Sequence, residues 1–511
     1  MSTPVHLYNT ASREVDLIAP PAGGESLTFY TCGPTVYDFA HIGNFRSFLN
    51  ADILRRTLEL CGYSVHHVMN ITDVGHMSDD TLADGGGEDK MAIASARLQE
   101  AKKAGELPAG SSIDPSDPYA IADFYADAFL EDGERLGIKV ITEAKDDPSL
   151  LPRPSRWVAE MISLVEELIA KGNAYVGGDG AVYFSVESFP AYGELSGNTI
   201  ENLREGQGGR ISSEHQSAKR HPADFLLWKP DPAHVMRWES PWGEGYPGWH
   251  LECSAMAMGL LAPKSGTIDI HSGGEDNIFP HHECEVAQSC AVSGAEAFSR
   301  IWFHTRHLIV EGEKMSKSKG NFFTVRDLLE KGATPAAIRL ELVRTHYRQN
   351  ANFTLQGLRD CGRMIDRWCR LRDRLVAGNG PGGDAPGPLE RALESFTGAL
   401  AEDLGIARAI GVLNEALNEY ALAPEHGGAH AASELKALEK MDSVLNVLTR
   451  NEVLSVGGDE EEAINTLIAE RTDAKAAKDW SRADAIRDQL LSEGIAIHDG
   501  PDGTTWSRIV E

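Results

Sequence analysis

The sequence contains few cysteines, no long apolar segment and fewer basic than acidic residues. Seven cysteines in 511 residues, an odd number scattered along the chain, exclude a disulfide framework. No run of about 18 apolar residues occurs, so no segment has the composition of a transmembrane helix. The first residues also lack the basic and apolar segments of a secretory signal. These absences predict a soluble, cytoplasmic protein with reduced thiols and no membrane partner.

The shortage of basic residues is large: 48 lysines and arginines stand against 77 aspartates and glutamates, which gives a formal net charge of −29. This charge excludes a protein that coats nucleic acid or anionic membranes without specificity, because phosphate groups repel it at long range. The exception is residues 300–374, with 16 basic and 8 acidic residues and hence a local charge of +8. We name residues 300–374 the basic strip and expect it to contact phosphate groups in a salt-sensitive way.

The pattern of apolar residues predicts an α/β fold. Residues 27–71 have the pattern of a βαβ unit: an apolar strand, a helix from Phe45 to Cys61 that Gly62 ends, and a second strand. Strand and helix patterns of the same type return after residue 234. We therefore expect a Rossmann-type parallel sheet that an inserted subdomain splits, followed by α-helical C-terminal domains. With about 100 to 200 residues per domain, the length allows about three to five units.

Changes in composition along the chain suggest the domain limits. The expected segments are 1–150 for the first half of the sheet domain, 151–234 for the inserted subdomain, 235–308 for the second half of the sheet domain, 309–360 for a connecting region, 361–455 for a helical bundle and 456–511 for a small terminal unit. Residues 73–118, rich in Gly, Asp and Ser around a helical run at 91–104, predict a surface insertion in the first half. The helices expected after the sheet span 324–342, 358–377, 389–422 and 432–451.

Two short motifs fall at the expected carboxyl edge of this sheet. HIGN, at residues 41–44, starts the first helix, where unpaired N–H groups, the helix dipole and a glycine favour a phosphate group; ordinary helix capping is the alternative. KMSKS, at residues 314–318, follows the last sheet strand, where lysines on a loop suit a triphosphate; a solvated basic loop is the alternative. Because parallel sheets bind ligands at the carboxyl ends of their strands, the two motifs together indicate a nucleotide site.

Cysteine, histidine and glutamate residues indicate a metal site. Cys32 follows the first strand, and Cys253 lies in GWHLECSAM. FPHHECE supplies His281 and Glu285, which are four residues apart and hence on one face of a helix. Two thiolates, one imidazole and one carboxylate are an acceptable zinc set, although a buried cysteine alone is more often a small apolar residue. The spacing leaves three neighbours open as competing ligands: His282, Glu283 and Cys284.

HIGN and KMSKS resemble the HIGH and KMSKS signatures of the class I aminoacyl-tRNA synthetases. KMSKS is intact here, whereas HIGH reads HIGN, so that Asn44 offers a hydrogen-bond donor but no titratable charge. YTCGPTVYD, NITD, GWHLECSAM, GGxDxxFPHHExE and KMSKS, in this order, resemble the cysteinyl-tRNA synthetases nearly end to end. The terminal segment KDWSRADAIRDQLLSEGIAIHDGPDGTTW resembles the anticodon-binding part of that family.

The resemblance implies a monomer that activates L-cysteine with ATP and Mg²⁺ to cysteinyl-adenylate and transfers it to the 3′-terminal ribose of tRNA(Cys). One zinc ion per chain would bind the substrate thiolate, so that serine is rejected without an editing domain. Region 309–360 and the basic strip would lie at the tRNA stem. The implied residues are Cys32, Cys253, His281 and Glu285 for zinc; Gly33, Thr35, Thr72, Trp249 and His271 for cysteine; His41, Gly43, Asn44, Gly274, Asp276 and Lys317 for ATP; His41, Asn44, Lys314 and Lys317 for catalysis; and Trp480, Asp484 and Asp499 for the anticodon.

Two other protein classes share part of this pattern. An ATP-dependent cysteine ligase of the mycothiol-pathway type would lack the roughly 190 residues that follow KMSKS. A noncatalytic tRNA-binding or zinc-structural protein would need neither KMSKS nor a zinc site open to substrate. In the terminal unit, Trp480 as a core anchor and the aspartates as turn or helix caps are the alternative to anticodon contacts. We expect His304 and His307 to have packing roles only.

Overall fold

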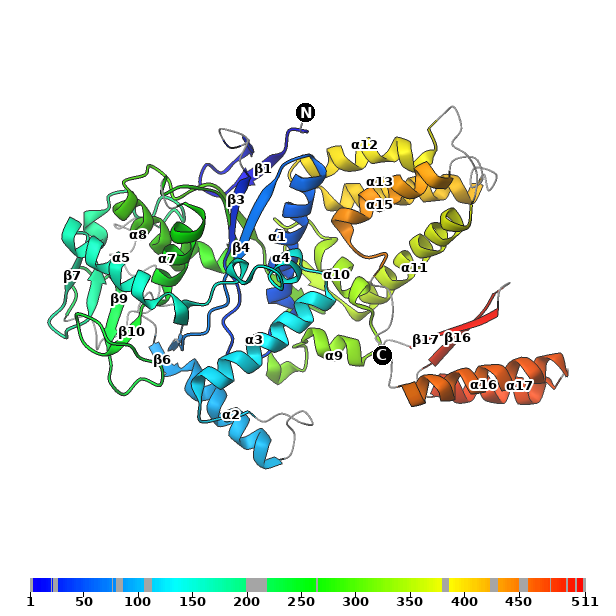
Figure 1. The fold of residues 1–511 in the computed structure, drawn as a ribbon. Helices are drawn as coiled ribbons and strands as arrows, with labels where there is room; N and C mark the ends of the chain where they lie inside the picture. Colours follow the sequence, from blue (N-terminus) through cyan, green and yellow to red (C-terminus); the bar gives the residue numbers. More distant parts are fainter. Residues whose placement is uncertain are drawn as a thin grey trace.

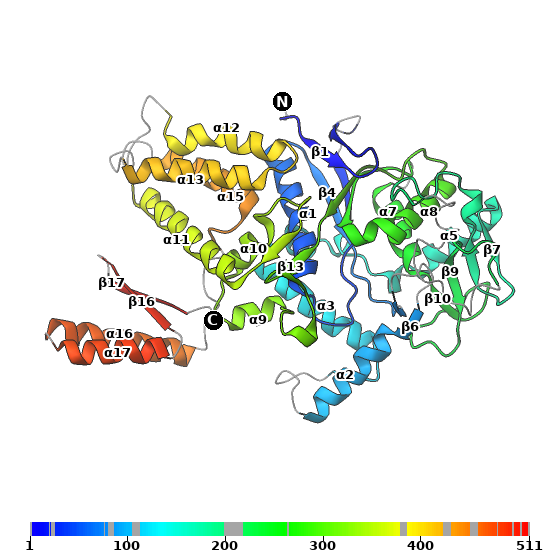
Figure 2. The same ribbon diagram turned by 180° about the vertical axis from the view of Figure 1, so that it is seen from behind.

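The computed structural model places three parts side by side: an antiparallel sheet with its helices, a central parallel sheet, and a helical part that leads to the C-terminus (Figures 1 and 2). It describes residues 3–19, 21, 26–75, 77–79, 86–104, 113–198, 218–262, 265–378, 386–422, 431–449, 458–477, 479–492, 495–500 and 503–508. Within these residues, no helix has the length and hydropathy that a membrane span needs.

The central sheet has four parallel strands. In spatial order they are β12 (Ser299–Thr305), β11 (Ile268–Gly274), β3 (Leu27–Thr31) and β4 (Val65–Met69). Strand β3 pairs in parallel with β4 on one side and with β11 on the other, although β11 comes much later in the chain. The predicted split parallel sheet is therefore confirmed. A small hairpin at the N-terminus consists of β1 (His6–Asn9) and β2 (Glu14–Leu17).

Helix α1 (Ile42–Leu60) connects β3 to β4 and completes the predicted βαβ unit. Its side chains Phe45, Leu49 and Leu58 are buried in the main apolar core. The helix ends before Gly62, whose positive φ of 91° is a conformation that glycine adopts without a steric penalty. The amino end of α1 therefore lies at the carboxyl ends of the strands, where parallel sheets bind ligands.

A second, antiparallel sheet comes from the chain between β4 and β11. Its strands, in spatial order, are β10 (Gly245–Pro247), β9 (Phe225–Pro230), β8 (Val182–Phe184) and β7 (Ala174–Val176). Helix α5 (Val158–Lys171) buries Met161, Val165 and Leu168 in the apolar core of this part. Two further helices contribute to the same core: α7 (Trp249–Leu261) and α8 (Glu283–Ser293).

The segment predicted as a surface insertion, 73–118, contains regular structure. It includes the paired strands β5 (Met77–Asp79) and β6 (Gly86–Asp89), followed by helix α2 (Lys90–Ala104). Helix α2, which covers the helical run expected at 91–104, packs on α3 (Pro118–Arg135). The short helix α4 (Lys139–Glu143) follows α3 and leads back toward the central sheet.

After β12 the chain forms a three-stranded sheet and two short helices. The strands, in spatial order, are β14 (Glu313–Lys314), β13 (Leu308–Val310) and β15 (Ala351–Phe353), and the helices are α9 (Val325–Glu330) and α10 (Pro335–Val343). The prediction of one helix over 324–342 is wrong. Gly332, with a φ of 85°, follows the end of α9, and Thr334 and Pro335 start α10 as its N-cap and first residue.

Helices form most of the remaining chain. They are α11 (Leu355–Ala377), α12 (Pro388–Ala401), α13 (Ile406–Leu422), α15 (Ala431–Leu445), α16 (Gly458–Ala476) and α17 (Trp480–Ser492). One helix over 389–422 is a wrong prediction, because Asp403 and Leu404 have positive φ angles of 54° and 49° and separate α12 from α13. A hairpin of β16 (Ile495–Gly500) and β17 (Gly503–Arg508) follows α17. The domain limits proposed from the sequence stay predictions.

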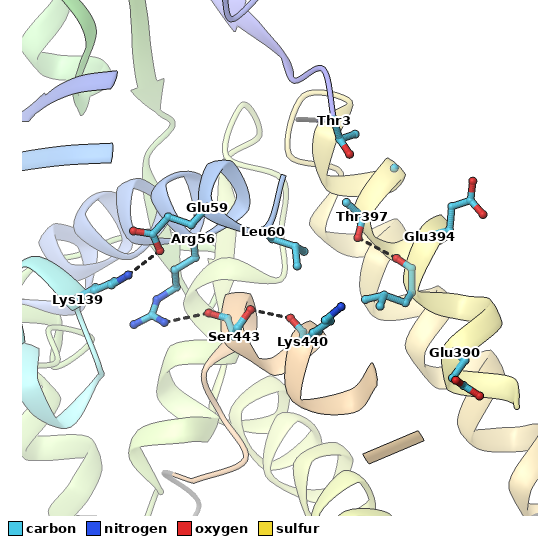
Figure 3. A pocket seen from close by; sticks show the side chains of 12 residues that line it. Thr3, Arg56, Glu59, Leu60, Lys139, Glu390, Glu394, Thr397, Lys440 and Ser443 are labelled. Carbon is cyan, nitrogen blue, oxygen red and sulfur yellow. Dashed lines mark hydrogen bonds and ion pairs between the residues drawn. The ribbon is translucent and has the colours of Figure 1, made fainter. Parts of the chain in front are cut away.

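A groove of about 930 Å³ lies between α1 and the helices α12 and α15 (Figure 3). Two of its cationic side chains have partners: Lys139 Nζ lies 2.6 Å from Glu59 Oε2, and Arg56 donates to the Ser443 carbonyl at 2.9 Å. Because Arg56 and Glu59 belong to the last turns of α1, the groove lies at the helix end opposite HIGN. It is therefore part of the junction between the bundle and the sheet domain, away from the two motifs.

Candidate active site and metal centre

HIGN forms the amino end of α1. His41 is the N-cap residue: its Nδ1 accepts the Asn44 backbone N–H at 3.2 Å, and Asn44 Oδ1 accepts the His41 backbone N–H at 3.1 Å. This reciprocal pair is a capping box, so the capping interpretation of HIGN describes the structure. Because Nδ1 accepts a hydrogen bond, the neutral imidazole carries its proton on Nε2, which can donate to a ligand. Burial lowers the pKa of His41 and favours this neutral form.

KMSKS lies directly against HIGN. Met315 packs so closely on Gly43 that a Cβ atom at this glycine would lie 2.7 Å from Met315 Cε. Just after KMSKS, the Phe323 carbonyl accepts the Ile42 backbone N–H at 3.0 Å. Lys314 ends strand β14 and is exposed. The structure therefore brings the two motifs, distant in sequence, together at the amino end of α1.

The other residues expected at ATP lie around the same end of α1. Lys317 Nζ is 2.7 Å from Oδ2 of Asp38, which belongs to the loop between β3 and α1. Gly274 ends β11, and Asp276 follows in the next turn. The negative charge of Asp276 opposes the effect of burial on the pKa of His41, so the two side chains interact electrostatically.

Four residues expected to bind zinc come together in the core: Cys32, Cys253, His281 and Glu285. Their ligand atoms lie within 4.8 Å of one another, and all four side chains are buried. Cys32 Sγ is 3.7 Å from Cys253 Sγ and 3.6 Å from Glu285 Oε1, while His281 Nε2 is 3.1 Å from Glu285 Oε1. Both cysteines are free thiols. Two sulfurs, an imidazole nitrogen and a carboxylate oxygen around one point fit the donor set that zinc prefers.

A second group of potential ligands shares two of these residues. It combines Cys32 and Glu285 with His271 and His282, again buried and with ligand atoms within 4.8 Å. Cys32 Sγ is 3.3 Å from His282 Nε2, and His271 Nε2 is 2.9 Å from Glu285 Oε2. The geometry alone therefore leaves His281 and His282 as alternative metal ligands.

Glu283 and Cys284, which the sequence spacing leaves open as ligands, have other contacts. The Glu283 carboxylate accepts the backbone N–H groups of Gly193 and Ser196, both at 2.8 Å. Cys284 Sγ lies 3.6 Å from the Tyr192 hydroxyl, in the core of the antiparallel sheet. Over the described part of the chain, neither residue belongs to a group that could hold a metal ion.

Two histidines that sequence reasoning did not use in the site contact the potential ligands. His250 Nδ1 lies 3.0 Å from Nδ1 of His281, whose Nε2 therefore faces the metal group. His304 Nε2 lies 2.8 Å from Nδ1 of His282, so the expectation of a packing role for His304 misses a polar contact. His250 was detectable, because GWHLECSAM contains it. His307 is exposed.

Without a metal ion, a protonated imidazole balances the carboxylate in the buried group. Burial raises the pKa of Glu285, but the interactions of its carboxylate with His271 and His281 outweigh this effect and lower the pKa to about 2. A hydrogen bond from Cys32 lowers the pKa of Cys253 to about 7, whereas burial raises the pKa of Cys32 itself. Although burial lowers the pKa of His281, hydrogen bonds to Cys253 and Glu285 raise it to about 10, so the imidazole holds a proton among these donors. A metal ion would replace this proton, which fits a cation site.

The residues expected at substrate cysteine lie next to the metal group: Gly33, Thr35, Thr72, Trp249 and His271. Thr35 and Thr72 form a parallel bridge, and the Trp249 ring is 4.7 Å from the His281 ring. A Cβ atom on Gly33 would lie 1.6 Å from the Asn70 carbonyl oxygen, so only glycine fits there. Asn70 also donates to Thr72 Oγ1 at 2.9 Å. Asn70 belongs to NITD, and sequence reasoning assigned it no role.

The terminal unit presents one of its expected anticodon residues at the surface. Trp480 starts α17 and is 59% exposed, and the core of this unit consists of isoleucine and leucine side chains. The alternative of Trp480 as a core anchor is therefore wrong. Asp484 Oδ1 is 3.0 Å from Arg487 Nη1 on the same helix. The Asp499 side chain lies outside the described residues.

Comparison with known proteins defines the class first. The family "tRNA synthetases class I (C) catalytic domain" matches residues 19–362. Mycobacterium tuberculosis methionyl-tRNA synthetase in complex with methionyl-adenylate has a TM-score of 0.52 at 15% identity, over 83% of this chain and 90% of that one. LeuRS of Agrobacterium radiobacter K84, in a ternary complex with tRNA and LeuAMS, has a TM-score of 0.54 at 13% identity, over 84% of each chain. The fold is that of a class I aminoacyl-tRNA synthetase, as predicted.

The comparison of sequences then identifies the family. "Cysteine--tRNA ligase" of Salinibacter ruber is 40% identical over 98% of both chains. "Cysteine--tRNA ligase" of Chlamydia pneumoniae is 41% identical over 98% of this chain and 97% of its own. The family "Cysteinyl-tRNA ligase anticodon binding domain" matches residues 458–506. The chain belongs to the cysteinyl-tRNA synthetases and is a ligase, so the resemblance is confirmed and the alternative of a ligase without an anticodon unit is wrong.

Proposed function

We propose that this ligase activates L-cysteine with ATP and transfers it to the 3′-terminal ribose of tRNA(Cys), with zinc as the element that selects cysteine. The observation that carries the proposal is the buried group of two sulfurs, one imidazole and one carboxylate. Cys32 directly follows β3, and the loop after it leads to His41 at the start of α1. The proposed site for the thiolate would therefore lie on the same sheet edge as the nucleotide motifs.

The group of Cys32, Cys253, His281 and Glu285 would hold the zinc ion. Its two sulfur donors suit zinc better than the single sulfur of the group with His271 and His282. Bound zinc would bind the thiolate of cysteine strongly, whereas the neutral hydroxyl of serine is a poor match. Recognition through such a bond rejects the analogue that lacks it, so no editing domain is needed.

The side chains of this protein would position the substrates and compensate phosphate charge. The cysteine carboxylate attacks the α-phosphate of Mg²⁺-bound ATP, and pyrophosphate leaves. The N–H groups at the amino end of α1, His41 Nε2–H and the Asn44 amide would bind phosphate oxygens. Lys314 and Lys317, on the KMSKS loop, would neutralise the charge that develops on pyrophosphate. Catalysis would then rest on positioning and electrostatics.

Helix α11 carries a row of arginines that fits an RNA backbone. The row consists of Arg359, Arg363, Arg367, Arg370 and Arg374. Intervals of three and four residues place these side chains on one face of the helix, and all except Arg359 are exposed. The opposite face buries Leu358, Trp368 and Leu375 in the main core. We name these residues the arginine row; it belongs to the basic strip and would bind tRNA phosphates.

Exchange of labelled pyrophosphate into ATP tests the proposed function. Cysteine is expected to support exchange, and serine to support it about 10⁴-fold less well, because the hydroxyl lacks the bond to zinc. The assay is run with each standard amino acid and followed by charging of transcribed tRNA(Cys). Exchange that depends on a different amino acid, or none with cysteine, would contradict the proposal. The monomeric state and the cytoplasmic location stay predictions.

Removing charge from the arginine row is expected to weaken tRNA binding without affecting activation. The triple variant Arg363→Gln, Arg370→Gln and Arg374→Gln should raise the KM for tRNA about tenfold or more. It should also reduce the slope of log affinity against log salt by about 1 for each lost phosphate contact. The matched control removes three charges from α12 and α15: Arg391→Gln, Lys436→Gln and Lys440→Gln. Equal effects of the two variants on tRNA binding would show that only net charge matters.

A further inference from the structure

Asp38, in the loop between β3 and α1, binds two cations from different parts of the chain. Its Oδ2 accepts from Lys317 Nζ at 2.7 Å and from Arg97 Nη1 at 2.8 Å. Its Oδ1 accepts the backbone N–H of Phe39 at 2.9 Å. Lys317 belongs to KMSKS, whereas Arg97 comes from helix α2 of the 73–118 segment. One carboxylate therefore connects the KMSKS loop to the insertion.

The carboxylate of Asp38 lies beside the expected position of the triphosphate. Lys317 Nζ is 5.0 Å from the centre of the Phe322 ring, which is 5.4 Å from the His41 ring. The charges of Asp38 and Lys317 both reach His41, because they shift its pKa in opposite directions on top of the effect of burial. A negative charge at this position repels ATP unless a cation compensates it.

Packing holds Arg97 next to Asp38. Helix α2 buries Met91, Ala94 and Leu98, spaced three and four residues apart, against the main core. Arg97 projects from a neighbouring position and is 49% exposed, so its side chain reaches the carboxylate without being confined. The place of Arg97 is therefore set by the fold and does not depend on Lys317.

We propose that Arg97 is a positioning residue for ATP, acting through Asp38; the inference rests on the proposed function of KMSKS. When Lys317 moves to the phosphates, Asp38 loses one of its two cations. Arg97 keeps the carboxylate paired, so that it neither repels the triphosphate nor draws Lys317 back. Helix α2 of the insertion thus contributes to the affinity for ATP, although it supplies no phosphate ligand itself.

A double-mutant cycle tests this role. The dissociation constant of Mg²⁺–ATP is measured by calorimetry for the wild type, Arg97→Gln, Asp38→Asn and the double variant. We expect Arg97→Gln to weaken binding about five- to tenfold when Asp38 is present, and less than about twofold in the Asp38→Asn background. In exchange assays the same pattern should affect the KM for ATP more than kcat. Lys103→Gln, on the same helix, removes one charge away from Asp38 and serves as the control.

The proposal is tested by comparing how much Arg97→Gln raises the dissociation constant of Mg²⁺–ATP in the wild-type and in the Asp38→Asn background. An equal loss of ATP affinity in the two backgrounds would mean that Arg97 only supports the packing of α2. No loss of affinity in either background would mean that Arg97 has no role in ATP binding. Either result would overturn the proposal. Because calorimetry needs no cysteine, failure of the proposed function is seen separately, as absent cysteine-dependent exchange in the wild type. An effect of Lys103→Gln as large as that of Arg97→Gln would also overturn the proposal.

Discussion

Replacing Cys253 by serine is expected to abolish binding of the proposed zinc ion and to lower cysteine-dependent exchange about a hundredfold or more. The side chain is one of two sulfur donors in the buried group, 3.7 Å from Cys32 Sγ. Serine has nearly the same shape, but its neutral hydroxyl is a poor zinc ligand. Metal analysis of the purified protein and the exchange assay measure the two effects independently.

Cys290→Ser is the matched control for this prediction. Cys290 is buried in α8, and burial raises the pKa of its thiol to about 11, but it belongs to neither potential metal group of the described residues. The control should retain one zinc ion per chain and most of the activity. The variant His282→Ala separates the two groups: zinc retained in Cys253→Ser and lost in His282→Ala would show that the ion binds the group with His271 instead.

The position of the site could be predicted from the sequence because it follows from the order of strands and motifs. Cys32 and HIGN come directly after an apolar strand, and KMSKS comes after the last strand pattern. In a parallel sheet these points share one edge, whatever the details of packing. The fold class and the meeting of the two motifs at α1 were therefore predictable.

The choice among neighbouring ligands was not predictable in the same way. Glu283 and Glu285 are both buried, and spacing cannot tell which one faces Cys32. The answer depends on the chain around residue 193, whose backbone N–H groups take up the Glu283 carboxylate. His281 also follows a kink before α8 begins, because Phe279 is extended with φ and ψ of −139° and 131°, and helical periodicity does not describe such a kink.

The break between α12 and α13 has a long-range cause as well. Leu404 keeps a four-residue apolar spacing from Leu400 across the break, so periodicity alone predicts one helix. Asp403 adopts its positive φ where its carboxylate accepts the Tyr8 backbone N–H at 2.9 Å and pairs with Arg348 at 2.6 Å. Both partners are distant in sequence, and no local pattern announces them.

Arg339→Met is expected to lower the free energy of unfolding by about 3 to 5 kcal/mol, because it breaks a buried ion pair that joins the bundle to the sheet domain. Arg339 is fully buried on α10, with Nη2 2.6 Å from Oδ2 of Asp52 on α1. The same guanidinium donates to the carbonyl oxygens of Leu136 at 3.0 Å and Leu445 at 2.6 Å. The Arg339 side chain therefore joins α10 to three other segments, those of Asp52, Leu136 and Leu445. Methionine has no guanidinium group, so it cannot pair with Asp52 or donate to these carbonyl oxygens. Urea denaturation followed by circular dichroism measures the change.

Arg391→Met is the control, since Arg391 forms a half-exposed ion pair with Glu419 in the same bundle. This variant should change the free energy of unfolding by less than about 1 kcal/mol.

The pH dependence of the Arg339→Met effect gives a second test. Burial raises the pKa of Asp52, but Arg56 and Arg339 together hold this pKa well below its usual value. The ion pair therefore stabilises the protein above the unfolded pKa of about 3.9 and loses this effect as the pH falls below it. The difference between wild type and Arg339→Met should shrink below about pH 4, and a difference independent of pH would contradict the role of Asp52.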